Sequence, residues 1–252
     1  MRIVRRSWSV AVKAVSVAAI VVLAVALVLV MRQADAPAPP PRFAGSLQVD
    51  AAPTTPDLAV SPAGGAPVDR IDPAWAARVS EGSGIPVRAL LAYASADVTI
   101  DAEQPGCGLG WNTIAAIGSI ESVHGTIHGS QLGADGYSAP AIRGPALDGN
   151  GFATIRDTEG GAWDGDARWD RAVGPMQFIP STWKKWASDG NGDGVADPNQ
   201  IDDAALGTAR YLCASGDVTG VDNWRAAVFS YNHLDSYVDD VASRANRYAA
   251  AG

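Results

Sequence analysis

One carboxylate, Glu121, lies in a segment that predicts an apolar helix face. Three, four and seven residues before it stand Gly118, Ile117 and Ile114, which share its face of a 3.6-residue helix. Burial there would raise the pKa of the carboxyl, which suits a general acid at neutral pH, and Gly118 would leave space for a ligand. Alternatively, Glu121 marks the edge of a solvent-facing stripe. His124 either pairs with this carboxylate or interacts with the helix dipole.

Two later segments place polar groups beside apolar ones. Gln177 stands between Met176 and Phe178 in a run that reads Gly-Pro-Met-Gln-Phe-Ile-Pro-Ser-Thr-Trp. Its amide can both donate to and accept from an N-acetyl group or a sugar hydroxyl. Tyr231 and Asn232 follow later, at an expected helix end, in Ser-Tyr-Asn-His. The amide of Gln177 is thus suited to contact a sugar beside an apolar packing surface.

The motifs Ile-Glu-Ser-Val-His-Gly, Gly-Pro-Met-Gln-Phe-Ile-Pro-Ser-Thr-Trp and Ser-Tyr-Asn-His occur in this order, with an acidic loop between the last two. Over roughly residues 70–248 the chain thereby resembles lytic murein transglycosylases of the membrane-bound B type, especially their actinobacterial relatives. The resemblance implies a lysozyme-like helical fold and cleavage of the β-1,4 bond between N-acetylmuramic acid and N-acetylglucosamine in peptidoglycan glycan strands. Residues 126–171 depart from the family's pattern.

The resemblance also assigns roles to individual residues. It implies that Glu121 is the single catalytic acid/base and that Gln177, Tyr231 and Asn232 line the sugar-binding groove. We expect Met176 and Phe178, which flank Gln177, to contact the substrate as well.

The number of carboxylates separates two mechanisms. Ordinary glycosidases need two, roughly 5 Å or 6.5 to 9.5 Å apart. Possible second carboxylates are Asp135, Asp148, Asp157 and Asp170. The resemblance implies that Glu121 alone protonates the leaving oxygen and then accepts the proton of the muramic acid 6-hydroxyl as a 1,6-anhydro ring closes. That chemistry needs no cofactor. The alternatives are a muramidase-type hydrolase and a non-catalytic peptidoglycan-binding protein of the same fold.

The acidic loop at residues 189–203 has the spacing of a calcium loop. Oxygen ligands stand at positions 1, 3 and 5, a glycine at 6 and a backbone carbonyl at 7, from Asp189, Asn191, Asp193, Gly194 and Val195. Gln200 at position 12 cannot supply the usual bidentate carboxylate, so we expect Asp203, or less favourably Asp202, to close the site. A structural calcium ion is therefore predicted. The alternative is a turn without an ion, because Asp, Asn and Gly favour turns regardless.

The elements that must position these groups are helices. Signals occur at 73–79, 87–93, 111–124, 180–187, 203–212 and in two runs within 223–248, with no convincing strand alternation. The Gly-, Asp- and Trp-rich stretch 125–171 is long enough to indicate a functional loop or lid. The fold class expected is mainly α, with a long irregular loop region, in a domain at residues 69–252.

The N-terminus carries a membrane signal. Residues 14–31 hold one polar side chain, Ser16, and about 27 Å of helix would nearly cross a bilayer core. Four basic residues precede them, which predicts a cytoplasmic tip and single-pass anchor at 1–32 with the rest extracytoplasmic. The alternative is secretion after signal cleavage, because Ala34-Asp35-Ala36 resembles a cleavage site. Residues 33–68 contain eight prolines and predict a disordered, extended linker.

The cysteine and charge content bear on disulfide formation and on the class of binding partner. Cys107 and Cys213 are the two cysteines, and an exported chain favours a disulfide between them over two buried thiols. Acidic residues outnumber basic ones 27 to 19, which argues against nucleic-acid binding. We expect a monomer that contacts glycan strands and the membrane.

Overall fold

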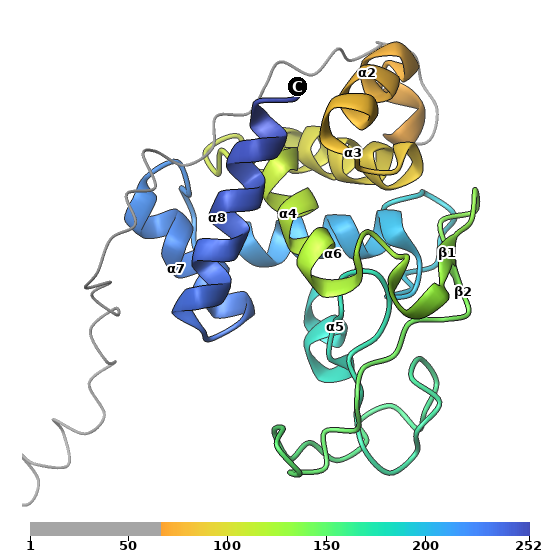
Figure 1. Ribbon diagram of the computed structural model, residues 1–252. Coiled ribbons are helices and arrows are strands. Elements are labelled where there is room, and N and C mark those ends of the chain that lie inside the picture. The colour runs from red at the N-terminus through yellow and green to blue at the C-terminus, as the bar shows by residue number, and fades with distance from the viewer. Residues whose placement is uncertain (1–66) are drawn as a thin grey trace, which may run out of the picture. The chain divides into compact units, whose positions relative to one another are not determined.

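Helix α4, Trp111–Ser122, is the central helix of the domain (Figure 1). The computed structural model describes residues 67–252. Every residue from Trp111 to Ser119 is buried, as expected for a helix surrounded by others. Its largest contact is with α8 (Asp235–Ala249), and α3 (Val87–Glu103) packs on both α4 and α6 (Ile201–Cys213). The apolar centre of the domain therefore follows α4.

The remaining elements surround this core. Short helices and a two-stranded hairpin complete the described chain: η1 (Pro67–Arg70), α2 (Pro73–Ser83), η2 (Ile127–Gly129), β1 (Gln131–Leu132), β2 (Ser138–Ala139), α5 (Pro180–Trp186) and α7 (Val221–Tyr231). The mainly helical prediction is confirmed, and each predicted helix is present. Although the sequence shows no convincing strand alternation, β1 and β2 are present and pair antiparallel. Strands of two residues are too short to show alternation in the sequence.

Helix α2 illustrates how local signals set element bounds. The Asp72 side chain accepts a hydrogen bond from the backbone N–H of Ala74 (2.9 Å), and Pro73 occupies the first helical position. Gly84 then ends the helix in the left-handed region, with φ of 75°. The helix is thus bounded by its own sequence at both ends.

The start of α4 is instead fixed by another helix. Its N-cap residue, Gly110, has no side chain, and the carboxylate of Asp97 in α3 accepts the backbone N–H of Trp111 (2.7 Å). Asp97 is completely buried, and this burial raises its pKa to about 7. Trp75 of α2 packs edge-on against Trp111, with ring centroids 5.6 Å apart. These contacts from α2 and α3 fix where α4 begins.

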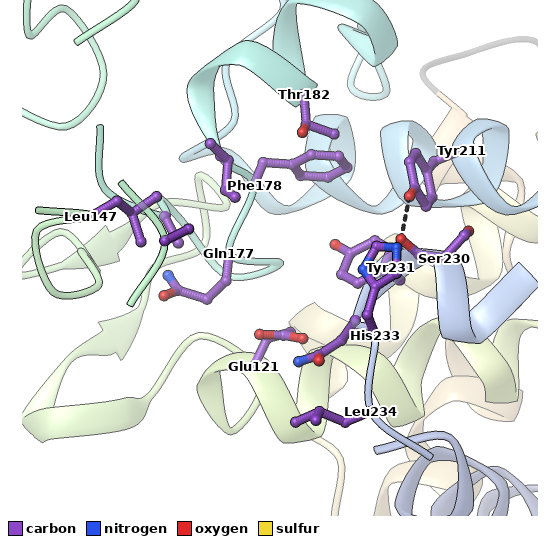
Figure 2. A pocket seen from close by; sticks show the side chains of 14 residues that line it. Glu121, Leu147, Gln177, Phe178, Thr182, Tyr211, Ser230, Tyr231, His233 and Leu234 are labelled. Carbon is purple, nitrogen blue, oxygen red and sulfur yellow. Dashed lines mark hydrogen bonds between the residues drawn. The ribbon is translucent and has the colours of Figure 1, made fainter. Parts of the chain in front are cut away.

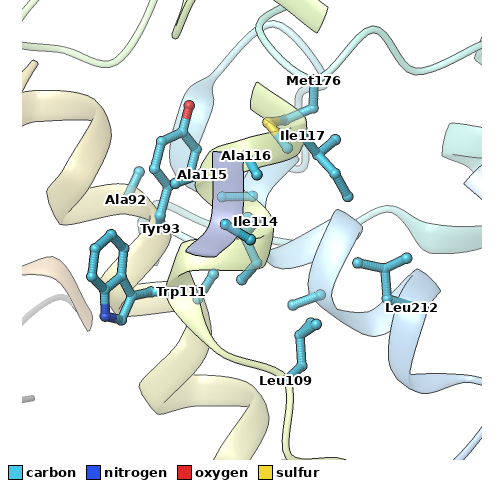
Figure 3. Close-up of a cluster of buried hydrophobic side chains, with 14 of the residues drawn as sticks. Ala92, Tyr93, Leu109, Trp111, Ile114, Ala115, Ala116, Ile117, Met176 and Leu212 are labelled. Carbon is cyan, nitrogen blue, oxygen red and sulfur yellow. The ribbon is translucent and has the colours of Figure 1, made fainter. Parts of the chain in front are cut away.

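Large side chains from distant segments fill the space around α4 (Figure 3). Tyr93 of α3, Met176 of a later loop and Leu212 of α6 are buried with Ile114 and Ile117. The helix that carries Glu121 is therefore held by residues spread over more than 100 positions of the chain.

The predicted disulfide is confirmed: Cys107 and Cys213 are bonded, with α-carbons 5.6 Å apart. The bond joins the loop before α4 to the last residue of α6.

The N-terminal predictions fall outside the described residues. These are the cytoplasmic tip and anchor at 1–32 and the linker up to residue 66, and they stay predictions. Within residues 67–252, no helix combines the length and the apolar character that a membrane crossing requires.

The disulfide yields a stability prediction. Replacing both cysteines by serine should lower the free energy of unfolding by up to about 4.7 kcal/mol, because the bond closes a loop of sequence separation 106. Urea denaturation of the purified soluble domain measures this change. A midpoint equal to that of the oxidised wild type would contradict it.

Candidate active site

A pocket of about 660 Å³ opens beside the C-terminal end of α4 (Figure 2). Its size is that of small-molecule and sugar sites. Figure 2 shows Glu121 between Gln177 on one side and Tyr231 and His233 on the other. Four parts of the chain line the pocket: the end of α4 (Glu121), the irregular loop (Leu147, Ala153 and Ala172), the segment around α5 (Gln177, Phe178, Ile179 and Thr182), and α6 with the end of α7 (Tyr211, Ser230, Tyr231, Asn232, His233 and Leu234).

Glu121 reaches the pocket because α4 ends abruptly after it. Val123, His124 and Gly125 all have positive φ, at 52°, 58° and 82°. The backbone N–H of His124 closes the helix on the carbonyl of Gly118 (3.0 Å), which satisfies one of the last helical carbonyls. A β-branched residue rarely adopts this conformation, so Val123 is strained next to the site.

The expected space for a ligand at Gly118 is not there. A β-carbon at this position would collide with the hydroxyl of Tyr93 and lie 3.2 Å from the sulfur of Met176. Protein atoms therefore fill the space, and Gly118 allows α3 and the Met176 loop to approach α4 closely.

Met176 likewise does not line the pocket. Its side chain is 0% exposed and belongs to the core. Met176 contacts a pocket residue through its backbone, because its carbonyl accepts a hydrogen bond from the hydroxyl of Tyr231 (2.7 Å). The prediction that its side chain contacts substrate is corrected accordingly.

Gln177 is presented by a tight turn. Val173 and Phe178 pair across the turn through two backbone hydrogen bonds. Gly174 is required there, because its φ is 73° and a β-carbon would collide with the carbonyl of Pro198. Gln177 itself has φ of 51°, and its side-chain nitrogen donates to the carbonyl of Gly174 (3.0 Å). That bond fixes the amide within the pocket.

Aromatic rings form one wall of the pocket. Phe178 and Tyr231 have ring centroids 5.9 Å apart, and Tyr211 lies 5.4 Å from Tyr231. The hydroxyl of Tyr231 is occupied by the Met176 carbonyl, so this residue offers mainly its ring to a ligand. Asn232 ends α7 and places its amide in the pocket lining.

Tyr237 is a site residue that the sequence reasoning missed. Its hydroxyl donates to Glu121 Oε1 (2.6 Å) although the two residues are 116 positions apart. A usable signal existed, because a tyrosine on the buried face of an amphipathic helix usually needs a partner for its hydroxyl.

Burial raises the pKa of Glu121 to about 7, and the hydrogen bond from Tyr237 opposes that rise. The carboxyl thus keeps its proton to a higher pH than an exposed glutamate does. A group with this pKa can both give and take a proton near neutral pH.

His124 plays neither of its expected roles. It is buried, and its two ring nitrogens lie 3.2 Å from the Tyr93 hydroxyl and 3.1 Å from the Tyr248 hydroxyl. Burial, followed by the charge of Arg244, lowers its pKa to about 4. It is a neutral bridge between α3 and α8 that supports the end of α4.

The four possible second carboxylates lie elsewhere. Asp135, Asp148 and Asp157 accept backbone N–H groups within two to four residues of themselves, and Asp170 accepts the amide and hydroxyl of Thr158. None of them lines the pocket. Among the residues that the structure describes, Glu121 is the one carboxylate in this lining.

The acidic loop is organised by its own backbone. Asp189 accepts the N–H groups of Gly192, Asp193 and Gly194, and Asp203 accepts those of Gly190, Asn191 and Asp197. Asp202 instead pairs with Arg88, which leaves Asp203 as the residue that closes the loop. Gln200, the irregular twelfth position, caps α6.

These contacts do not by themselves form a metal site. In the span 67–252, no three His, Cys, Asp or Glu side chains are arranged to hold a metal ion. Burial, and then the charge of Asp189, raises the pKa of Asp203 to about 6. A bound cation would relieve that unfavourable charge, and the calcium site stays a prediction.

Calcium should therefore raise the melting temperature of the domain relative to a chelator, since saturation at about 100 times Kd stabilises by roughly 2.7 kcal/mol. Asp203→Asn should remove the difference. Identical melting curves for the wild type with calcium and with chelator would contradict the calcium prediction.

Tyr237→Phe should raise the pKa of Glu121 above its value of about 7, because it removes a hydrogen bond to the charged carboxylate. A ¹³C NMR titration of the Glu121 carboxyl measures the shift. Tyr248→Phe, also on α8 but in contact with His124, is the matched control and should leave the pKa unchanged. An unchanged or lower pKa of Glu121 in Tyr237→Phe would contradict the claim that the Tyr237 hydrogen bond stabilises the charged carboxylate.

Comparisons with known proteins point to one family. The model of the transglycosylase SLT domain matches residues 106–250, whereas no curated protein matches this chain. Among solved structures, SltB3 from Pseudomonas aeruginosa in complex with NAG-anhNAM-pentapeptide is similar at 18% identity and a TM-score of 0.42, over 68% of this chain and 65% of that one. The Escherichia coli lytic transglycosylase Slt35 in complex with bulgecin A is similar at 14% identity and a TM-score of 0.40, over 71% and 78%.

The match to this chain thus spans less than two thirds of the SltB3 chain. The family model, in contrast, covers more than half of the present chain, including the end of α4, the Gln177 turn and the end of α7. The chain belongs to the transglycosylase SLT domain family.

Proposed function

We propose that the protein is a peptidoglycan lytic transglycosylase in which Glu121 alone serves as acid and base. It would cleave the β-1,4 bond between N-acetylmuramic acid and N-acetylglucosamine and leave a 1,6-anhydro end. One observation carries this proposal: among residues 67–252, Glu121 is the one carboxylate in the pocket lining. Burial also raises its pKa to about 7.

The first half of the reaction needs a proton donor. Protonated Glu121 would donate to the glycosidic oxygen as the bond to C1 of the muramic acid breaks. The substrate's own N-acetyl group would assist at C1, the task that a second carboxylate performs in ordinary retaining enzymes. Because no second carboxylate of the described residues lines the pocket, the proposal requires this assistance.

The second half needs a proton acceptor. The Glu121 carboxylate would take the proton of the muramic acid 6-hydroxyl as that oxygen closes on C1. The hydrogen bond from Tyr237 would stabilise the carboxylate in this interval. Water must be kept from C1, and Phe178 and Tyr231 supply apolar surface to the pocket lining.

The remaining lining suits a glycan. Gln177, held by Gly174, offers a fixed amide for N-acetyl and hydroxyl groups. Asn232 adds a second amide residue to the lining, and the Tyr231 ring offers a stacking surface. The lysozyme-like architecture implied by the sequence motifs belongs to the same proposal. A muramidase-type hydrolase would require a second carboxylate or a positioned water opposite Glu121.

Glu121→Gln tests the proposal most simply. Activity on purified peptidoglycan should fall about 10²- to 10⁴-fold, because the amide cannot transfer a proton, while the fold and glycan binding persist. Turbidity loss of a peptidoglycan suspension measures turnover, and cosedimentation measures binding.

The matched control is Asp148→Asn, the same carboxyl-to-amide change beside Leu147 but outside the pocket lining. It should keep nearly full activity. Wild-type protein that binds peptidoglycan without cleaving it would identify a binding protein instead.

A further inference from the structure

The irregular loop next to the pocket differs in charge from the rest of the described chain. Residues 143–185 carry six basic and six acidic side chains, whereas the rest of 67–252 carries seven basic and eighteen acidic ones. This balanced segment supplies Leu147, Ala153 and Ala172 to the pocket lining. In Figure 1 its loops extend beyond α5, away from α2 and α3.

The acidic side chains of this segment are directed at its own backbone. Asp157 accepts the N–H groups of Glu159, Gly160 and Gly161, and Asp166 accepts those of Arg168 and Trp169. The remaining members do the same or bind a neighbouring side chain: Asp148, Glu159, Asp164 and Asp170. These hydrogen bonds lower the pKa of Asp148, Asp157 and Asp166. These carboxylates thus stay ionised, and hydrogen bonds within the loop stabilise their charge.

Three arginines of the segment have no carboxylate partner. Arg143, Arg156 and Arg168 are exposed, and none forms an ion pair with any residue in 67–252. The guanidinium groups of Arg156 and Arg168 lie over the ring of Trp169, at 4.0 Å and 5.7 Å from its centroid. The ring limits their motion and leaves their N–H donors available.

The segment that carries these arginines borders the pocket at Gln177. A β-carbon on Gly144, the residue after Arg143, would lie 3.2 Å from Gln177 Oε1. Arg171 donates to the carbonyl of Gly144 (3.2 Å), and Ala172 lines the pocket. Figure 2 shows Leu147 beyond Gln177, on the side of the pocket away from Leu234. Arg143 is therefore one residue away in sequence from the backbone that contacts Gln177 at this end of the pocket.

We infer that this arginine surface, formed by Arg143, Arg156 and Arg168, binds the carboxylates of the stem peptide on the glycan that occupies the pocket. The inference rests on the proposed function. Muramic acid carries this peptide on its lactyl group, so the carboxylates arrive tethered to the substrate at high effective concentration. Guanidinium groups match carboxylates through paired N–H donors. The acidic remainder of the domain would repel the same groups.

The test compares two substrates, both freed of phosphate-containing wall polymers. One is peptide-bearing peptidoglycan, and the other is the same glycan after an amidase has removed the peptides. The variant is Arg143→Gln with Arg168→Gln, which leaves Arg156 on Trp169. The control is Arg78→Gln with Arg247→Gln, two exposed arginines on α2 and α8. Circular dichroism confirms that both variants are folded.

The variant should raise KM for the peptide-bearing substrate by roughly fivefold, as expected for the loss of two exposed charge pairs. Its kcat, and its KM for the stripped glycan, should equal those of the wild type. The control should leave KM unchanged for both substrates.

The inference would be overturned if the variant raised KM equally on both substrates, raised it on neither, or if the control raised it as much. None of these results would affect the proposed function. A loss that appears only on walls retaining phosphate polymers would assign the surface to that polymer and also overturn it. Wild-type protein that cleaves neither substrate would refute the proposed function together with the inference.

Discussion

A carboxyl group held at the end of a buried apolar helix is the constraint on which the site depends. Burial raises the pKa of Glu121 from 4.5 to about 7, so its contribution to stability is complete below pH about 4.5 and is lost as the pH rises through about 7. Asp97, with a pKa also raised to about 7, has the same sign. Ionisation of either of these two carboxyl groups at neutral pH therefore works against folding, and of the pair Glu121 lines the pocket.

The rest of the fold offsets that cost and fixes the helix in place. Asp97 holds the first turn of α4, and the His124 bridge between Tyr93 and Tyr248 supports its last turn. The Cys107–Cys213 bond ties the loop before α4 to α6. Because both ends of α4 are held by other elements, the carboxyl of Glu121 stays beside the pocket rather than turning into solvent.

Sequence reasoning reached the features that depend on local patterns. Helix periodicity, capping residues and Gly-Pro punctuation placed the helices, and the spacing around Glu121 placed it on an apolar face. The errors came from contacts between distant segments. Nothing local to Gly118 shows that Tyr93 and Met176 fill the space beside it, and nothing local to His124 shows its two tyrosine partners. The arginines over Trp169 were also invisible, because the loop that brings them together is built from side-chain to backbone hydrogen bonds without periodicity.

Glu121 acts as both the acid and the base in the proposed reaction, and the chemical form of the product ends shows whether it does. Mass analysis of the glycan fragments released by the purified soluble domain measures this directly. A single acid/base that closes the ring predicts muramic ends one water lighter than reducing ends, in the 1,6-anhydro form. Fragments that carry only reducing muramic ends would show that water attacks C1, and would contradict the account.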